Sequence, residues 1–385
     1  MHIVLGNSSL VKYQHGGGLW SWFLQYPMAL KAAGHDVFWL ELLQSSGSRE
    51  TDLRTMRHFY DRLRPYDLTG NCALLLFHHA LDSQPFEDAE VFGASTGYVR
   101  RLIAESDLLL NFSCALRQPL LSLFKRRALL DGDPGHLQIS LSIVDLDFDL
   151  DHHDVFLTVG TRINAPDSII PKLGHEWQTF EQLIYLPLWK CEPELKNDSP
   201  FTSITQWTWE ELHYGGRIFS VSKRDAYLKY LRLPQLVDCS LELAANIGQS
   251  DTTGDHALLS ENGWRLVDPH QVASCPARYH EYIRDSRGEF MCPKPIHVQL
   301  RTGWFSERSL AYLASGRPVV AEETGFSERI PTGIGLLAFH DLSTAAAAIA
   351  EVDANYERHR RAARELVEAY FDWRKTVETI LSACA

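Results

Sequence analysis

The residues best suited to chemistry lie around a glycine turn in the C-terminal part of the chain. Gly303 is followed by Ser306, which opens a predicted helix, and Lys294, Arg301 and Arg308 are close to it in sequence. A helix start presents free backbone N–H groups and the positive end of its dipole to an anion. The basic side chains would add charge-assisted hydrogen bonds to a diphosphate. The pattern fits either a diphosphate site or an ordinary loop-to-helix junction with surface arginines.

Three residues in the N-terminal half are candidates for a general base. His15 lies in a glycine loop after the first predicted strand, and Asp131 and Asp133 end an apolar run. A neutral imidazole takes a hydroxyl proton readily near neutral pH, whereas an aspartate needs a raised pKa or acts by orientation. The alternatives are a loop histidine that only bonds to backbone, and a turn built from Asp-Gly and Asp-Pro.

Two Asp-x-Asp runs raise the question of a divalent metal. They are Asp131-x-Asp133 and Asp147-x-Asp149, a pattern by which carboxylates can hold a divalent metal ion. Around the second run, acids alternate with apolar residues, as in a half-exposed strand or loop. The adjacent histidines at 78–79 and 152–153 lack the helical spacing of two metal-binding histidines. We therefore predict no metal site.

The elements that must position these residues follow a βα alternation. Residues 2–5 form an apolar run, glycines follow at 16–18, and a helical pattern ends at Gly34 before a second apolar run at 36–41. A βαβ unit of this kind predicts a parallel sheet. A similar alternation begins at residue 201, and residues 343–380 have the spacing of a pair of terminal helices.

A proline-rich segment separates the two alternations. Residues 186–200 contain three prolines and little periodicity, which is typical of a linker. We therefore predict an N-terminal Rossmann-like domain over 1–190, a C-terminal Rossmann-like domain over 200–365, and a terminal helix over 366–385 that packs back on the first domain. Ligands of such sheets bind at the carboxyl ends of the strands, so the cleft between the domains is the expected site.

Composition and charge exclude several classes. The chain has 385 residues, 45% of them hydrophobic and 22% charged, which suits a globular protein of two domains. Its formal net charge of −12 argues against a nucleic-acid partner. No apolar stretch reaches the length of a bilayer span, and the start does not have the pattern of an export signal. The seven cysteines form no C-x-x-C pair, so we expect a cytoplasmic protein without zinc or disulfides.

Gly303-Trp304-Phe305-Ser306 and the Gly-Arg-Pro-Val-Val run at 316–320 resemble the donor-binding box of GT-B superfamily glycosyltransferases. In the similar plant UDP-glycosyltransferase box, His-Cys-Gly-Trp-Asn-Ser precedes a helix and a Gly-x-Pro turn. Blocks at 131–135, 156–160, 286–290 and 323–327 resemble a bacterial branch of the superfamily. The resemblance implies an α/β fold of the GT-B type, with two Rossmann-like domains that face each other across a cleft.

The resemblance also implies roles for individual residues. Ser306 and the backbone after Gly303 would hold the donor diphosphate, and Arg301 replaces the histidine of the plant box. Ser309 stands where that box has a ribose-binding glutamate, which puts the plant mode of ribose binding in doubt. The segment 323–325 falls near the pair that touches the donor sugar. The full candidate donor set is Gly17, Lys294, Arg301, Gly303, Trp304, Ser306, Glu307, Arg308, Ser309, Glu323, Thr324 and Gly325.

The expected function is transfer of a hexosyl group from a nucleoside-diphosphate sugar to a hydroxyl of a small molecule or glycan. The nucleotide-sugar is a co-substrate, and no other cofactor and no metal are expected. Two alternatives remain open: a nucleotide-sugar 2-epimerase of the same fold, and a non-catalytic protein that binds nucleotide-sugar to assist a partner. The epimerase would consume donor without an acceptor, and the non-catalytic protein would neither transfer nor hydrolyse it.

Overall fold

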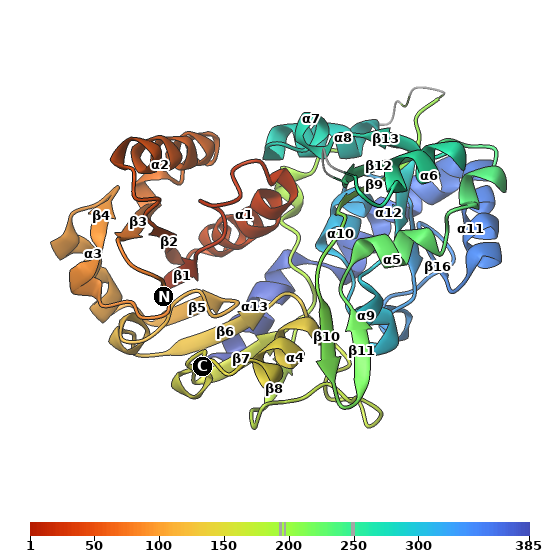
Figure 1. The fold of residues 1–385 in the computed structure, drawn as a ribbon. Helices are drawn as coiled ribbons and strands as arrows, with labels where there is room; N and C mark the ends of the chain where they lie inside the picture. Colours follow the sequence, from red (N-terminus) through yellow and green to blue (C-terminus); the bar gives the residue numbers. More distant parts are fainter. Residues whose placement is uncertain (192–194, 196–197, 248–250) are drawn as a thin grey trace.

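A computed structural model describes residues 1–191, 195, 198–247 and 251–385. Part of the predicted linker, residues 192–194 and 196–197, lies outside the described residues. Two sheets lie side by side, one built from each half of the chain (Figure 1). No helix in the described ranges is long and apolar enough to cross a membrane.

The first sheet has the strand order β4-β3-β2-β1-β5-β6-β7-β8. All its pairs are parallel except β3 with β4, as the βα alternation predicts. Its strands are β1 (His2–Asn7), β2 (Asp36–Gln44), β3 (Cys72–Phe77), β4 (Glu90–Phe92), β5 (Leu108–Phe112), β6 (Arg127–Asp131), β7 (Val155–Thr158) and β8 (Trp177–Thr179). The helices between them are α1 (Gly17–Ala32), α2 (Arg49–Leu63), α3 (Thr96–Glu105) and α4 (His136–Ile143).

The second sheet is wholly parallel, with the order β13-β12-β9-β14-β15-β16. Its strands are β9 (Phe201–Gln206), β12 (Leu241–Asn246), β13 (Arg265–Val267), β14 (Gly288–Met291), β15 (Val319–Glu322) and β16 (Leu336–Phe339). Its helices are α5 (Lys223–Leu228), α6 (Asp255–Glu261), α7 (Pro269–Val272), α8 (Pro276–Asp285), α9 (Pro295–Gln299), α10 (Glu307–Ala314), α11 (Leu342–Ala354) and α12 (Tyr356–Tyr370).

The end of the chain differs from the predicted pair of helices. Three helices follow β16, because Asn355 ends α11 and Asp372 caps a separate α13 (Trp373–Ala383). This last helix returns to the first domain. Arg126 donates to the Cys384 carbonyl (3.1 Å), and Trp373 packs edge-on against Tyr185 with the ring centroids 5.2 Å apart. The first domain therefore includes the final turns of the chain.

A hairpin that the sequence analysis did not predict also links the domains. Strands β10 (Glu211–Tyr214) and β11 (Arg217–Ser220) follow β9, and both residues of the turn between them, Gly215 and Gly216, have positive φ. Leu212 and Phe219 of the hairpin are buried in one cluster with Leu129 and Ile139 of the first domain. The hairpin thus carries part of the second domain into the core of the first.

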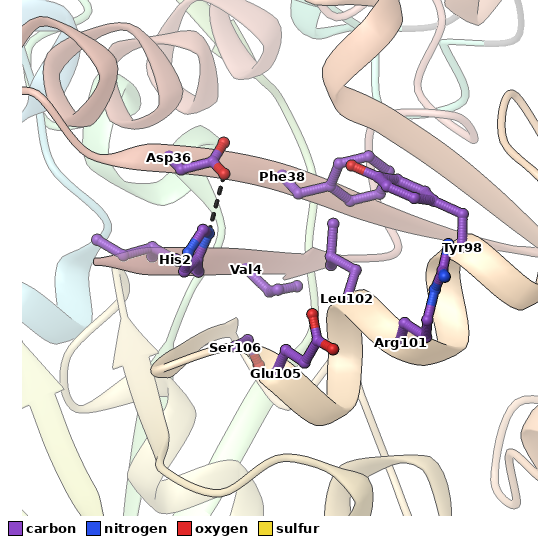
Figure 2. A pocket seen from close by; sticks show the side chains of 10 residues that line it. His2, Val4, Asp36, Phe38, Tyr98, Arg101, Leu102, Glu105 and Ser106 are labelled. Carbon is purple, nitrogen blue, oxygen red and sulfur yellow. Dashed lines mark hydrogen bonds and ion pairs between the residues drawn. The ribbon is translucent and has the colours of Figure 1, made fainter.

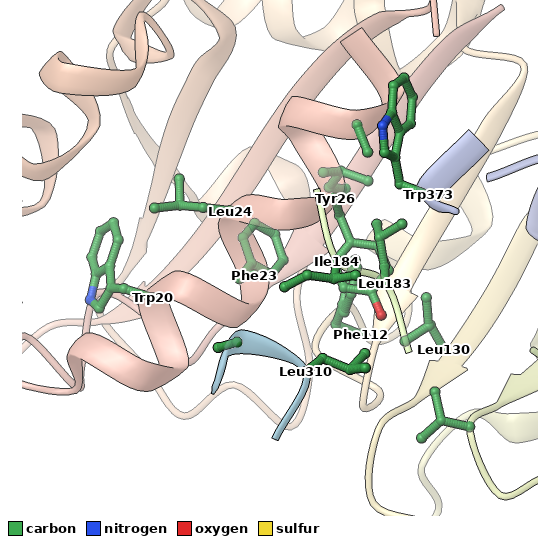
Figure 3. Packing of buried hydrophobic residues seen from close by; sticks show 14 of the residues in the cluster. Trp20, Phe23, Leu24, Tyr26, Phe112, Leu130, Leu183, Ile184, Leu310 and Trp373 are labelled. Atoms are coloured by element: carbon green, nitrogen blue, oxygen red, sulfur yellow. The ribbon is translucent and has the colours of Figure 1, made fainter. Parts of the chain in front are cut away.

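The largest core cluster continues across the domain boundary. Phe23 of α1, Phe112 at the end of β5, Leu310 of α10 and Trp373 of α13 belong to one buried cluster (Figure 3). Burying apolar side chains is the main favourable term in folding and in domain association. The two domains are therefore packed together, and the site between them is formed by polar residues at the strand ends.

A cavity of about 280 Å³ lies at the opposite, amino-terminal end of β1 and β2. Its wall includes His2 and Asp36, which share a 2.9 Å contact, and Tyr98 and Glu105 of α3 (Figure 2). Ligands of parallel sheets bind at the carboxyl ends of strands. This cavity therefore lies away from the candidate site.

Candidate active site between the two domains

At the end of β6, Asp131 organises the loop that follows. The carboxylate is buried and accepts hydrogen bonds from Gln138 Nε2 (2.8 Å), Thr158 Oγ1 (2.7 Å) and the Asp133 amide (2.8 Å). Burial raises the pKa of Asp131 to about 6, although these hydrogen bonds act in the opposite direction. The contacts explain a loop-ordering role, and a catalytic role for Asp131 remains a prediction.

Asp133 faces the second domain. Its carboxylate forms an ion pair with Lys294, accepts from His297 Nε2 (3.2 Å), and contacts Nδ1 of His136 (2.8 Å). Burial disfavours the charged carboxylate, but Lys294 and the two histidines outweigh it and hold the pKa of Asp133 well below its usual value. Asp133 is therefore an ionised carboxylate at the point where the two domains meet.

A group of basic side chains lies on the second domain behind Lys294. Lys223, in the first turn of α5, donates to the Cys292 carbonyl and has its ammonium 5.9 Å from the centroid of the Trp304 ring. Burial, followed by the charges of Arg308 and Lys294, lowers the pKa of Lys223 to about 7. Lys294 is paired with Asp133 and Arg308 with Glu289, whereas the hydrogen bond of Lys223 goes to a neutral carbonyl. We call Lys223, Lys294 and Arg308 the cation pocket.

Arg308 is fixed in the cation pocket by buried partners. Its Nε contacts Glu289 Oε1 (2.6 Å), and Nη1 donates to the Ile204 carbonyl (2.7 Å). Glu289 is fully buried, and its second oxygen accepts from Ser309 Oγ (2.5 Å). Nη2 of Arg308 has no hydrogen-bond partner. Ser309 thus supports the arginine through Glu289, and Nη2 of the guanidinium is a buried donor without a partner among the described residues.

The glycine turn joins the cation pocket to the first domain. Gly303 has φ of 72°, its amide donates to the Thr324 carbonyl (2.8 Å), and its own carbonyl accepts from Thr161 Oγ1 (3.1 Å). Trp304 stacks on His297 with ring centroids 4.5 Å apart, and its carbonyl accepts from Thr324 Oγ1 (2.5 Å). The predicted donor residues 303–304 and 324 are therefore held together.

Ser306, Glu323 and Glu307, three further candidates, lie in this region, and the first two stabilise its backbone. Ser306 caps α10 by accepting from the Arg308 amide (3.2 Å). Glu323 accepts from the amide of Gly325 (2.5 Å), which stabilises its own turn. Glu307, in the first turn of α10, has its pKa raised by burial. Ser306 and Glu323 thus stabilise the backbone next to the cation pocket.

Arg301 lies apart from the cation pocket. Its guanidinium contacts Glu328 (2.8 Å) and Asp167 (3.2 Å), and its side chain is 57% exposed. Arg162 shares both carboxylates. The sequence analysis therefore selected an arginine that the structure pairs with acids, and it missed Lys223, which no motif marks. The role of Arg301 at a diphosphate remains a prediction.

His15 and Gly17 lie at a second contact between the domains. The Gly17 amide donates to the Ala273 carbonyl (2.8 Å), and a Cβ on Gly17 would lie 2.4 Å from that oxygen. His15 is exposed beside His58 and His270. The glycine loop thus contacts the start of α8, and the catalytic role of His15 remains a prediction.

The described ranges contain no group of three or more His, Cys, Asp or Glu side chains arranged to hold a metal ion. Asp149, from the second Asp-x-Asp run, instead contacts Nε of Arg117 (2.6 Å), and both side chains are buried. All seven cysteines are free. The cation pocket is a positively charged group near the strand ends of the second domain.

Comparison with known proteins places this arrangement in a fold class. No family model and no curated protein matches the chain. Among solved structures, an alpha-glucosyltransferase in complex with UDP and DNA has a TM-score of 0.64 at 11% identity over 99% of this chain and 98% of its own. Anabaena HepE in complex with UDP and glucose has a TM-score of 0.57 at 14% identity, over 99% and 100%. Sucrose-phosphate synthase from Thermosynechococcus elongatus has 0.55 at 13%, over 99% and 97%. The chain has the GT-B fold, which confirms the predicted fold class.

The Gly303 turn should tolerate no side chain. A Cβ there would lie 2.3 Å from Thr161 Oγ1 and 3.1 Å from the Arg162 amide, whereas Gly215 has φ of 58° and nothing within 4 Å. Both substitutions to Ala strain a left-handed backbone, but only Gly303→Ala also pushes the domains apart. We expect it to lower the free energy of unfolding by about 1–3 kcal/mol more than Gly215→Ala in urea titrations. Equal losses would show that the close contact with the first domain does not matter.

Proposed function

We propose that this protein is a metal-independent glycosyltransferase that uses a nucleoside-diphosphate hexose as donor. The observation that carries the proposal is the cation pocket. Lys223, Lys294 and Arg308 converge near the carboxyl ends of β9 and β14, beside the start of α10. Lys223 has a depressed pKa, and Arg308 has an unpaired Nη2. A diphosphate would supply a negative charge beside Lys223 and an acceptor for Nη2 of Arg308.

The proposed reaction forms a bond between an acceptor oxygen and the anomeric carbon, while the bond from that carbon to the diphosphate breaks. The cation pocket and the dipole of α10 stabilise the charge that develops on the leaving diphosphate. The acceptor proton passes to a base, for which we propose Asp133. Lys294 belongs to the cation pocket and is also paired with Asp133, so a bound diphosphate competes for Lys294 and raises the pKa of Asp133 toward its usual value.

In this proposal the domain over 200–365 binds the donor, and the domain over 1–190 binds a small-molecule or glycan acceptor. UDP is the first nucleotide to test, because UDP is bound in the similar alpha-glucosyltransferase and HepE structures. A cytoplasmic location agrees with the seven free cysteines. Nucleic acid is not proposed as acceptor, since the net charge is −12.

A panel of UDP-, GDP-, dTDP- and ADP-hexoses tests the proposal. Each is incubated with the protein, with and without sugar alcohols and hexoses as acceptors, and the products are identified by mass spectrometry and NMR. Transfer to an acceptor, or slow release of free hexose, supports the transferase. A donor-derived 2-epimer formed without an acceptor would support the epimerase, and tight binding without any turnover would support the non-catalytic alternative.

Turnover is expected to continue in excess EDTA, because fixed cations and a helix dipole neutralise the diphosphate in place of a metal. The rate of nucleoside diphosphate release should stay within about twofold of the untreated protein. Adding Mn²⁺ or Mg²⁺ after EDTA should not increase this rate. Complete loss in EDTA with full recovery on adding Mn²⁺ would contradict the metal-independent mechanism.

A further inference from the structure

A second basic site lies at the Gly17–Ala273 contact between the domains. An open groove of about 540 Å³ is lined by His15, His270, Gln271, Ser274 and Arg278. Pockets of this volume accommodate small molecules. One wall comes from the loop before α1, and the other comes from α7 and α8, which lie beside α1 (Figure 1).

Two imidazoles, those of His15 and His270, line this groove, and a third, that of His58, lies next to His15. His15 lies between the other two, with ring centroids 6.3 Å from His58 and 6.0 Å from His270. His58 belongs to α2, so the first domain supplies two of the rings and the second domain supplies the third. All three side chains are exposed and can therefore reach a ligand in solution.

Two guanidinium groups add permanent positive charge. Arg62, one helical turn after His58, donates from Nη2 to the Ser274 carbonyl across the domain boundary (2.8 Å). Arg278 donates from Nη1 to the Gln271 carbonyl (2.7 Å). Both bonds use neutral carbonyl oxygens, so neither neutralises a charge. None of the residues that line the groove in the described part of the chain is acidic.

We propose that this groove binds a phosphate monoester, separately from the cation pocket. Two guanidinium groups and three imidazoles match the charge and the several acceptor oxygens of a phosphoryl dianion. The remaining volume accommodates a sugar attached to the phosphate. The ester arrives either as part of a phosphorylated acceptor or as a separate effector, and the phosphoryl group is common to both.

The two anion sites are distinct places in the structure. Tyr279 of α8 lies against Gly18, where an added Cβ would be 3.1 Å from its ring. The charges of Arg308 and Glu307 also act on Tyr279. Among the described residues, the lining of the groove includes none of Lys223, Lys294 and Arg308. The proposed second site can therefore be tested independently of the proposed donor site.

Protonation of His15 should make this binding depend on pH. Burial lowers the pKa of His15, followed by the charges of Arg62, His270 and His58. The other groups near the groove are Arg278, Cys275 and Tyr66, together with Asp268, which caps α7 through the His270 amide (2.9 Å). A bound dianion favours protonated imidazoles, so affinity rises as the pH falls. Sulfate is the suitable probe for this dependence, because it remains a dianion throughout.

Calorimetric titration of phosphate, glucose 6-phosphate and glucose into the full-length protein tests the proposal. We expect phosphate and glucose 6-phosphate to bind and glucose not to bind. The double variant His270→Gln with Arg278→Gln should bind both anions with an affinity lower by about tenfold or more. Lys223→Met should leave a site of unchanged affinity for them. Sulfate should bind more tightly at about pH 6 than at pH 8, and the affinity should depend less steeply on pH in the double variant.

Three results would overturn the site. They are no binding of either phosphate at millimolar concentration, unchanged affinity in the double variant, or complete loss of binding in Lys223→Met. Circular dichroism confirms that each variant is folded. Once binding at this site is established, transfer assays distinguish the two sources of the phosphoryl group. If glucose 6-phosphate stimulates transfer to neutral acceptors, it is an effector. If glucose 6-phosphate is itself glycosylated, it is an acceptor.

Discussion

Lys223→Met is expected to weaken UDP binding by about ten- to hundredfold, because one charge-assisted hydrogen bond to a diphosphate contributes about 1.5–3 kcal/mol. The substitution keeps a flexible, unbranched side chain and removes the ammonium, together with its contact with the Trp304 ring. Lys229→Met is the matched control, because Lys229 is an exposed lysine at the end of the same helix. Its affinity for UDP should equal that of the unmodified protein.

The pH dependence of UDP binding identifies the same side chain. In the free protein the pKa of Lys223 is lowered to about 7, first by burial and then by Arg308 and Lys294. A bound diphosphate raises that pKa, so binding takes up a proton above pH 7 and affinity falls as the pH rises from about 7 to 9. Lys223→Arg keeps its charge at every pH and should lose the dependence. Equal pH profiles in both proteins would contradict the assignment.

Asp133→Asn is expected to lower kcat by about 10²–10⁴-fold, the usual contribution of a positioned base. The amide keeps the size of the carboxylate but cannot take the acceptor proton. Donor affinity should stay the same or increase, because Lys294 is released from its ion pair with Asp133. The comparison therefore separates kcat from donor binding.

His15→Ala is the second variant of this experiment, because His15 is the base that the sequence pattern favours. The structure places it with His58 and His270, and we expect its loss to leave kcat for a neutral acceptor within about threefold. If Asp133→Asn keeps the full kcat and His15→Ala loses most of it, the general base is His15 and not Asp133. Full rates in both would exclude both residues.

The fold was largely predictable, because hydrophobic periodicity marks parallel strands and their helices directly. Residues 201–209 and 318–321 correspond to β9 and β15. The β10–β11 hairpin was missed, although Gly215-Gly216 between two short strands is a known hairpin signal. Its apolar side chains pack against the other domain, and local periodicity does not reveal that contact.

The candidate site was only partly predictable from the sequence. The Gly303 turn and Ser306 were found because a turn and a helix cap are local features. Lys223 was missed, because it is brought to Arg308 by strand order and lies 85 positions before it in the sequence. Arg301 was chosen because it is close to Gly303 and stands where the plant box has its histidine, but its side chain pairs with Glu328 and Asp167.

The crystal structure of this protein with UDP is the most direct test of the account. We predict that the diphosphate lies at the start of α10, with phosphate oxygens within hydrogen-bond distance of Lys223 Nζ and Arg308 Nη2. The ion pair of Lys294 with Asp133 should be lengthened or broken relative to the free protein. UDP bound elsewhere, with Lys223 still donating only to the Cys292 carbonyl, would contradict the proposed donor site.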